Sequence, residues 1–191
     1  MQLKAILNRV EKQGSFVYES VRFVEGPRLE MEVVVRPRVN SRLRCLGCGQ
    51  VGPSYDTLGL RRFEFVPLWG IAVFFVYTMR RVQCRQCGVR VEAVPWATGK
   101  HHLTKTYAWF LARWARRLSW KEAAEVFHTS WQKVFRSVEM AVEWGRAHQD
   151  LDDIEAIGID EIQWQRGHRY LTLVYQIDAG CRRLLWIGKK R

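Results

Sequence analysis

Two pairs of cysteines constrain the fold of this chain more than any other feature. Each pair has the spacing Cys-x-x-Cys and is followed by glycine, as CLGCG at 45–49 and CRQCG at 84–88. Two thiolates at this spacing hold one side of a tetrahedral zinc ion when the backbone turns tightly, and glycine relieves crowding in that turn. We therefore predict one structural zinc ion per chain, bound by Cys45, Cys48, Cys84 and Cys87. Small buried thiols or a redox pair are the alternatives.

The composition indicates a folded, basic chain. Hydrophobic residues make up 48% of the 191 residues, which excludes general disorder. The most apolar stretch, 65–79, is too short for a membrane span and is interrupted by proline and glycine, so we expect no membrane insertion. The N-terminus lacks an export signal, and we expect a cytoplasmic protein. The net charge is +12, and residues 1–150 carry 24 basic against 13 acidic side chains.

The first hundred residues have strand patterns. Residues 15–37 alternate in the manner of a hairpin with a turn at Gly26-Pro27, and residues 61–69 and 71–84 are rich in β-branched and aromatic residues around Gly70. Each cysteine pair would then lie at the end of a strand, which is the layout of a zinc ribbon. His101 and His102 follow in a loop, and we do not favour them as ligands because four thiolates already complete the site.

Helical spacing begins at Thr104. Apolar residues then recur at helical intervals as far as Leu118. Ser119 and Glu122 have the spacing of a capping box, which predicts the start of a second helix. His128 lies at a second break, and a third helix is expected from residue 131. We interpret this as a helix-turn-helix in which His128 has positive φ and Val126, Phe127, Val134 and Val138 fill the inner corner. An ordinary helical hairpin is the alternative.

The second helix of such a motif reads base edges in the major groove of double-stranded DNA. Its candidate readers are Gln132, Lys133 and Arg136. Phosphate binding is expected from the basic charge and from Arg42 and Arg44. Further arginines that we assign to the same role are Arg36, Arg38, Arg61, Arg62, Arg80, Arg81 and Arg85.

After an acidic linker, residues 157–189 read as three strands with turns at Gly167-His168 and Ala179-Gly180. Alternation places Asp160 and Glu161 on opposite faces of the first strand. A carboxylate held on a strand is what a two-metal phosphoryl-transfer site requires. From this segment alone, however, a salt-bridged or edge-exposed aspartate is the favoured interpretation.

The order of these motifs, ending in IGIDEIQWQRGHRYLTLVYQID at 157–178, resembles the front half of bacterial insertion-sequence transposases of the ISL3 group. The resemblance implies a zinc ribbon and helix-turn-helix that bind terminal inverted repeats, possible homodimers, and an RNase H-like domain. In that domain Asp, Asp and Glu would hold two Mg²⁺ ions for DNA cleavage and strand transfer. Only the first catalytic aspartate can be carried over, to Asp160. A bacterial, nucleoid-associated protein is implied.

We accordingly expect an α+β chain with a β-hairpin and zinc-ribbon domain at 1–100, a helix-turn-helix region at 101–149, and an incomplete RNase H-like domain at 150–191. The expected function is DNA binding by a truncated transposase that is catalytically inactive on its own. A zinc-ribbon and helix-turn-helix transcriptional repressor or accessory protein is the first alternative. A ribbon that binds RNA or another protein is the second.

Overall fold

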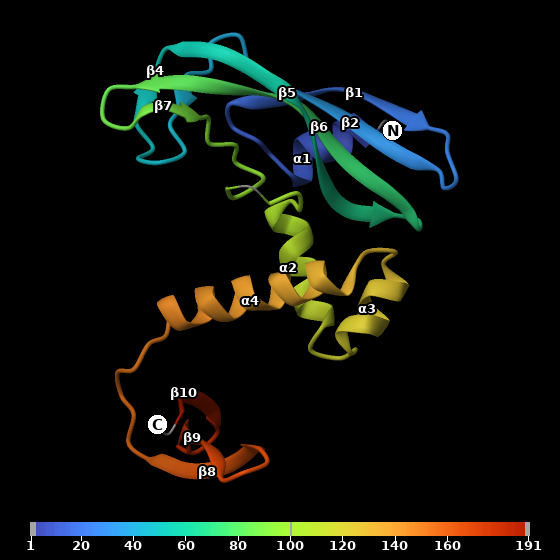
Figure 1. The fold of residues 1–191 in the computed structure, drawn as a ribbon. Coiled ribbons are helices and arrows are strands. Elements are labelled where there is room, and N and C mark those ends of the chain that lie inside the picture. The colour runs from blue at the N-terminus through green and yellow to red at the C-terminus, as the bar shows by residue number, and fades with distance from the viewer. Residues whose placement is uncertain (1–2, 100, 190–191) are drawn as a thin grey trace. The chain divides into compact units, whose positions relative to one another are not determined.

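The computed structural model describes residues 3–99 and 101–189. The chain divides into two compact units, Met1–Trp144 and Gly145–Arg191 (Figure 1). Helices and mainly antiparallel strands occur in separate stretches, and the predicted α+β class is confirmed. The strand-rich region and the helices that follow it, which we expected as separate domains, lie together in the first unit. Each unit is described by itself.

The first unit is built on a five-stranded sheet. A hairpin at its start was predicted and is present, with β1 antiparallel to β2. Strand β2 pairs in parallel with β6, which also pairs with β5 and β7. The sheet order is β1-β2-β6-β5, with β7 beside the end of β6 that carries Cys84. The elements are α1 (Leu3–Val10), β1 (Phe16–Val24), β2 (Glu30–Pro37), β5 (Ser54–Leu68), β6 (Ile71–Cys84) and β7 (Gly88–Val91).

A long hairpin dominates this sheet because β5 and β6 have long runs of β-branched and aromatic residues. Its turn contains Trp69 and Gly70, both with positive φ, as a tight connection between twisted strands requires. The core packs on Trp96, which is 1% exposed and meets the edges of the Phe16, Phe63 and Tyr77 rings. The cysteines are not part of this aromatic core.

Three helices follow, α2 (Lys105–Trp114), α3 (Trp120–Val126) and α4 (Trp131–Ala147). The predicted capping box is present, because the Ser119 side chain accepts from the backbone of Glu122 while the Glu122 carboxylate accepts from the backbone of Ser119. His128 has a φ of 52°, as expected of the residue that turns the chain between α3 and α4.

The helical core is smaller than the sequence suggested. Buried residues from all three helices meet in it, namely Tyr107, Leu111, Ala123, Ala124 and Val134. Val126 was expected in the inner corner but is 57% exposed, and Trp114 is 39% exposed. Trp114 still contacts Phe127, with ring centroids 5.6 Å apart. In α3, Ala123 and Ala124 face the core, and Val126 lies on the exposed side of the helix.

The second unit contains a three-stranded antiparallel sheet of order β10-β9-β8. Its strands are β8 (Ile157–Gln165), β9 (Arg169–Gln176) and β10 (Arg183–Lys189), as the sequence predicted. Gly167 and His168, both with positive φ, form the first turn. Only Leu173 and Gln176, on the central strand, are buried among residues 145–189. This unit therefore has very little core of its own.

Candidate metal centre and nucleic-acid interface

The two cysteine pairs meet at one end of the sheet. Short strands β3 (Leu43–Arg44) and β4 (Val51–Gly52) pair around the first knuckle, and the β6–β7 turn forms the second. The four cysteine sulfurs all lie within 4.8 Å of one another, and those of Cys48 and Cys84 are 3.4 Å apart. A tetrahedral zinc ion with Zn–S bonds of about 2.3 Å places its sulfurs roughly 3.8 Å apart. The cluster could hold one such metal ion.

The glycine that follows each pair has the expected role. Gly49 and Gly88 have φ values of 73° and 71°, which few other residues adopt without strain. Within the first knuckle the backbone N–H of Gly49 donates to the carbonyl of Cys45 at 2.8 Å, and the N–H of Gly47 donates to the Cys45 sulfur at 3.4 Å. These bonds fix the tight turn that directs two sulfurs to the same side.

The chemistry of the four sulfurs favours a cation among them. The backbone N–H of Cys87 lowers the pKa of the Cys84 thiol to about 7, whereas hydrogen bonding with Cys48 raises the pKa of the Cys87 thiol to about 12. Thiols this close cannot all ionise unless a positive charge compensates them. A divalent metal ion supplies that charge and takes the thiolate as its ligand.

Four of the nine arginines that we assigned to phosphate binding form ion pairs within the protein, which narrows the predicted basic surface. Arg36 and Arg81 pair with carboxylates on an adjacent strand, whereas Arg62 on β5 reaches across β6 to β2. The ion pairs at 4.0 Å or less are Arg36–Glu19, Arg62–Glu30, Arg62–Glu32, Arg80–Glu92 and Arg81–Asp56. Arg42 and Arg44 are exposed beside the first knuckle, where Arg44 donates to the carbonyl of Gly49 at 3.2 Å.

The candidate readers on α4 lie in two different environments. Gln132 and Arg136 are exposed and, being four residues apart, share one face of the helix. Lys133 instead extends to β5, where its ammonium group is 2.5 Å from the carboxylate of Glu64. The Glu64 side chain is only 9% exposed, so this ion pair fixes α4 against the sheet. This pairing could not be predicted from local spacing, because 69 residues separate the partners.

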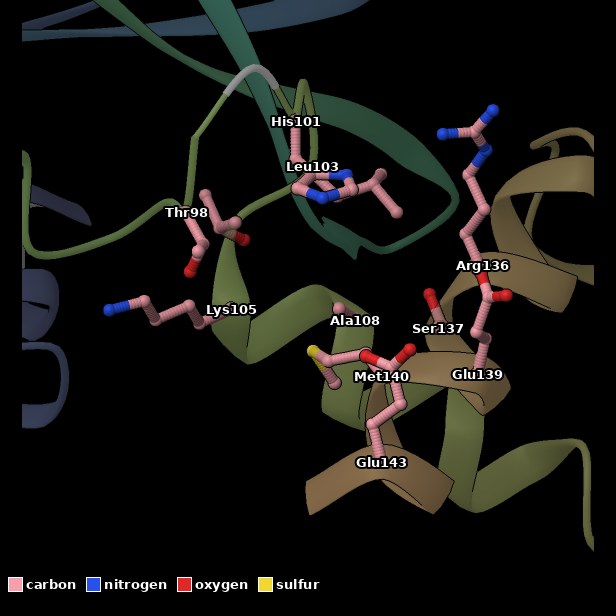
Figure 2. Close-up of a pocket in the computed structure, with 11 residues that line it drawn as sticks. Thr98, His101, Leu103, Lys105, Ala108, Arg136, Ser137, Glu139, Met140 and Glu143 are labelled. Atoms are coloured by element: carbon pink, nitrogen blue, oxygen red, sulfur yellow. The ribbon is translucent and has the colours of Figure 1, made fainter. Parts of the chain in front are cut away.

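A hollow of about 380 Å³ lies between α4 and the segment that leads into α2 (Figure 2). Figure 2 shows Arg136 extending from α4 away from Glu139 and Glu143, which lie further along the same helix. The lining combines these two acids with His101, Lys105 and Arg136, and this mixture of charge selects no single class of ligand. The Arg136 side chain lines this hollow and remains accessible to solvent.

Asp160 lies on β8, an edge strand, directly opposite Leu173 of β9. Opposed residues share a face, so Asp160 is on the face of the buried Leu173, while Glu161 is opposite Thr172 on the other face. Asp160 is exposed, and its carboxylate accepts from the backbone N–H of Glu161 at 2.8 Å. Asp178 accepts from the backbone of Ala156 at 2.6 Å, which assigns it a structural role at the end of β9.

The fold and these sites describe a class of protein that combines a four-cysteine ribbon, a helix-turn-helix arrangement and a separate small sheet. The DDE-type ISL3 transposase family, described as a transposase, matches residues 157–191. The transposase for insertion sequence element IS1557 of Mycobacterium tuberculosis, from strains H37Rv and CDC 1551, is 35% identical over 179 residues. That alignment covers 89% of this chain and 39% of the relative. The resemblance to ISL3-type insertion-sequence transposases is confirmed.

A second relative extends the comparison. The transposase for insertion sequence element IS1001 of Bordetella parapertussis is 26% identical over 174 residues, covering 91% of this chain and 42% of the relative. The chain thus spans about two fifths of the length of the curated relatives that it matches. No solved structure matches the chain significantly. None of the helices in the described residues is long and apolar enough to cross a membrane.

Proposed function

We propose that this chain is the DNA-binding front part of an insertion-sequence transposase and that it recognises the terminal inverted repeats of its element. The observation that carries the proposal is α4, which follows a tight turn at His128 and presents Gln132 and Arg136 together on an exposed face. Gln addresses adenine and Arg addresses guanine through paired hydrogen bonds in the major groove. We assign Lys133 to positioning of this helix, through Glu64, rather than to base reading.

The zinc ribbon would support DNA binding structurally and would have no catalytic role. Four cysteine ligands leave zinc no open position, so the ion would hold β3, β4 and the β6–β7 turn in place. Arg42 and Arg44 on that scaffold would contact phosphates, which positions the protein on the duplex but does not read its sequence. Because a transposon has two ends, we propose that a homodimer brings two copies of α4 to paired repeats.

The second unit would contribute to catalysis only as part of a larger site. We propose Asp160 as one ligand of the Mg²⁺ ions that a transposase of this family uses for strand cleavage and transfer. Two metal ions about 3.5–4 Å apart need several carboxylates, and Asp160 is the one catalytic carboxylate that the resemblance carries over to this sequence. The 191 residues alone are therefore expected to bind DNA without cutting it. A repressor or accessory protein that uses the same binding modules is the alternative.

The test compares binding to duplexes that carry the element's terminal repeat with binding to scrambled duplexes of the same length, by fluorescence anisotropy of the zinc-loaded chain. Gln132→Ala and Arg136→Ala are each expected to reduce the binding free energy for the repeat duplex by about 1–3 kcal/mol. Binding to the scrambled duplex should change little. Arg42→Gln should weaken binding to both duplexes alike and reduce the salt dependence of the affinity. Arg28→Gln, at an exposed position in the β1–β2 turn, is the matched control.

Two results would contradict the proposal. If Gln132→Ala and Arg136→Ala weaken binding to both duplexes equally, α4 does not recognise the DNA sequence. If the parent chain shows no preference for the repeat, terminal-repeat recognition is wrong and the accessory-protein alternative gains support.

A further inference from the structure

A second basic surface lies where α2 ends, away from the residues assigned above. Residues 113–117 have the sequence RWARR, which places arginines at intervals of three and four beside Trp114. A hollow of about 680 Å³ is lined by these three arginines and two aromatic rings, from Phe110, Arg113, Trp114, Arg116 and Arg117. Its lining contains no acidic residue.

The arginines of this hollow differ from those of the sheet. Within the described residues, Arg113, Arg116 and Arg117 have no carboxylate within 4.0 Å, whereas Arg62, Arg80 and Arg81 do. All three are exposed at the surface. Three uncompensated cations around one hollow create a local positive potential, which favours an anionic ligand.

The aromatic rings of the hollow are rigidly held but only partly covered. Trp114 is 39% exposed, yet its ring centroid is 5.6 Å from that of Phe127, which also contacts Phe110 at 4.9 Å. Phe127 therefore supports both rings from behind. A large apolar ring left exposed at a fixed position is unfavourable in water, and a flat ligand would cover it.

A neighbouring hollow continues this arrangement. It has a volume of about 660 Å³, shares Phe110, Arg113 and Arg116 with the first, and adds Trp109, which is 41% exposed. Each hollow thus combines one partly exposed tryptophan with the shared Arg113 and Arg116. Aromatic rings beside cations match a chain of anions that carries a flat group at each repeat, which is the chemistry of consecutive nucleotides.

We propose that this surface binds unpaired DNA, with phosphates on Arg113, Arg116 and Arg117 and bases stacked on Trp114 and Trp109. An intact duplex keeps its bases stacked inside and would use only the arginines, whereas single strands offer an exposed face at every base. The inference rests on the proposed DNA-binding function, since its ligand is also DNA, but it concerns a different surface from the reading face of α4.

The experiment measures binding of the zinc-loaded chain to fluorescein-labelled twelve-residue oligothymidylate and to a scrambled twelve-base-pair duplex. Trp114→Leu and Trp109→Leu are each expected to weaken oligothymidylate binding about tenfold, because stacking contributes strongly per base, and to leave duplex binding within about twofold. Trp114→Phe keeps a ring and should retain most of the affinity. The fold of each variant is checked by its melting temperature.

The arginines are tested with a charge-matched pair of variants. The triple variant R113Q/R116Q/R117Q should bind oligothymidylate at least about tenfold more weakly than R9Q/K12Q/R28Q, which removes the same charge from exposed positions elsewhere in the first unit. Equal weakening by the two triple variants would show that only net charge matters and would overturn the proposal.

Other outcomes separate this inference from the proposed function. Binding to repeat duplex without binding to oligothymidylate would refute the inference alone, whereas binding to no DNA would refute both. If the tryptophan variants lose duplex and single-strand binding equally, the surface does not recognise unpaired bases. If polyglutamate of equal charge displaces oligothymidylate as effectively as unlabelled oligothymidylate does, the surface is a general anion or acidic-protein site.

Discussion

At the scale of single residues, partners distant in sequence decide what a charged side chain does. Lys133 has the position of a base reader, yet it pairs with Glu64, whose side chain is 9% exposed. A carboxylate with so little access to water is destabilising unless a cation or hydrogen-bond donor satisfies it. Glu92 shows the same principle in the sheet, where it accepts from Tyr77 at 2.5 Å and from Arg80 at 2.7 Å.

The Lys133–Glu64 pair gives a prediction at this scale. Lys133→Met leaves Glu64 without its cation and is expected to lower the free energy of unfolding by about 1–3 kcal/mol, measured by urea denaturation. The double variant E64Q/K133M should recover part of this loss, because the remaining amide is less costly to leave unpaired. Arg136→Ala is the control, since Arg136 is exposed and its loss should not change stability.

The same variants discriminate between the two roles of Lys133. If Lys133 acts only by positioning α4 through Glu64, the ratio of repeat to scrambled duplex affinity should fall in Lys133→Met only together with a loss of stability. A fall in that ratio with no loss of stability would show that Lys133 reads bases after all.

Among the secondary-structure elements, the large sheet packs against two separate clusters of buried residues, one at the cysteine knuckles and one around Trp96. The knuckle cluster contains Leu43 and Val82 together with the cysteines, whereas the core around Trp96 takes its residues from α1, β1, β2, β5 and β6. The strands β5 and β6 are 15 and 14 residues long and so extend from one cluster to the other. Metal removal should therefore affect one end of the sheet more than the other.

Hydrogen exchange tests this expectation. We predict one zinc ion per chain, and its removal by a chelator should abolish amide protection at 43–52 and 82–91 while residues near Trp96 keep theirs. Cys45→Ser should lose the zinc, and Cys181→Ser, in the second unit, should retain a full equivalent. Unchanged protection at both knuckles after complete metal removal would contradict a structural ion.

At the scale of the whole molecule, the two units differ in how much they bury. The first has several clusters of buried side chains, whereas the described part of the second buries only Leu173 and Gln176 and exposes Ile159 to 68% and Trp186 to 52%. A three-stranded sheet with so little covered apolar surface gains little hydrophobic stabilisation. Such a sheet is a natural surface for further chain segments or partners to cover.

This contrast predicts unequal local stability. In native-state hydrogen exchange, amides of β8, β9 and β10 should exchange at least about tenfold faster than those of β1, β2 and β6, because opening the small sheet exposes less apolar surface. Limited proteolysis should cut first within 145–189. Equal protection in the two units would mean that another contact, such as self-association, covers the small sheet.

Features that depend on local chemistry could be predicted from the order of the residues. Glycine after each cysteine pair, the Ser119 capping box, positive φ at His128 and the three C-terminal strands each follow from residue type and short-range spacing, and all are present. The resemblance to insertion-sequence transposases was also predicted from the order of motifs.

Only the tertiary structure decided which charges remain available. Arg62, Arg80, Arg81 and Lys133 look like the free arginines at 113–117 in sequence, because spacing along a chain carries no information about carboxylates on other strands. The pairing of β7 with β6 brings Glu92 to Arg80, and the packing of α4 brings Lys133 to Glu64. The lining of the hollow at the end of α2 contains no acidic residue. Long-range pairing thus separates the arginines that hold the fold from those that can bind a ligand.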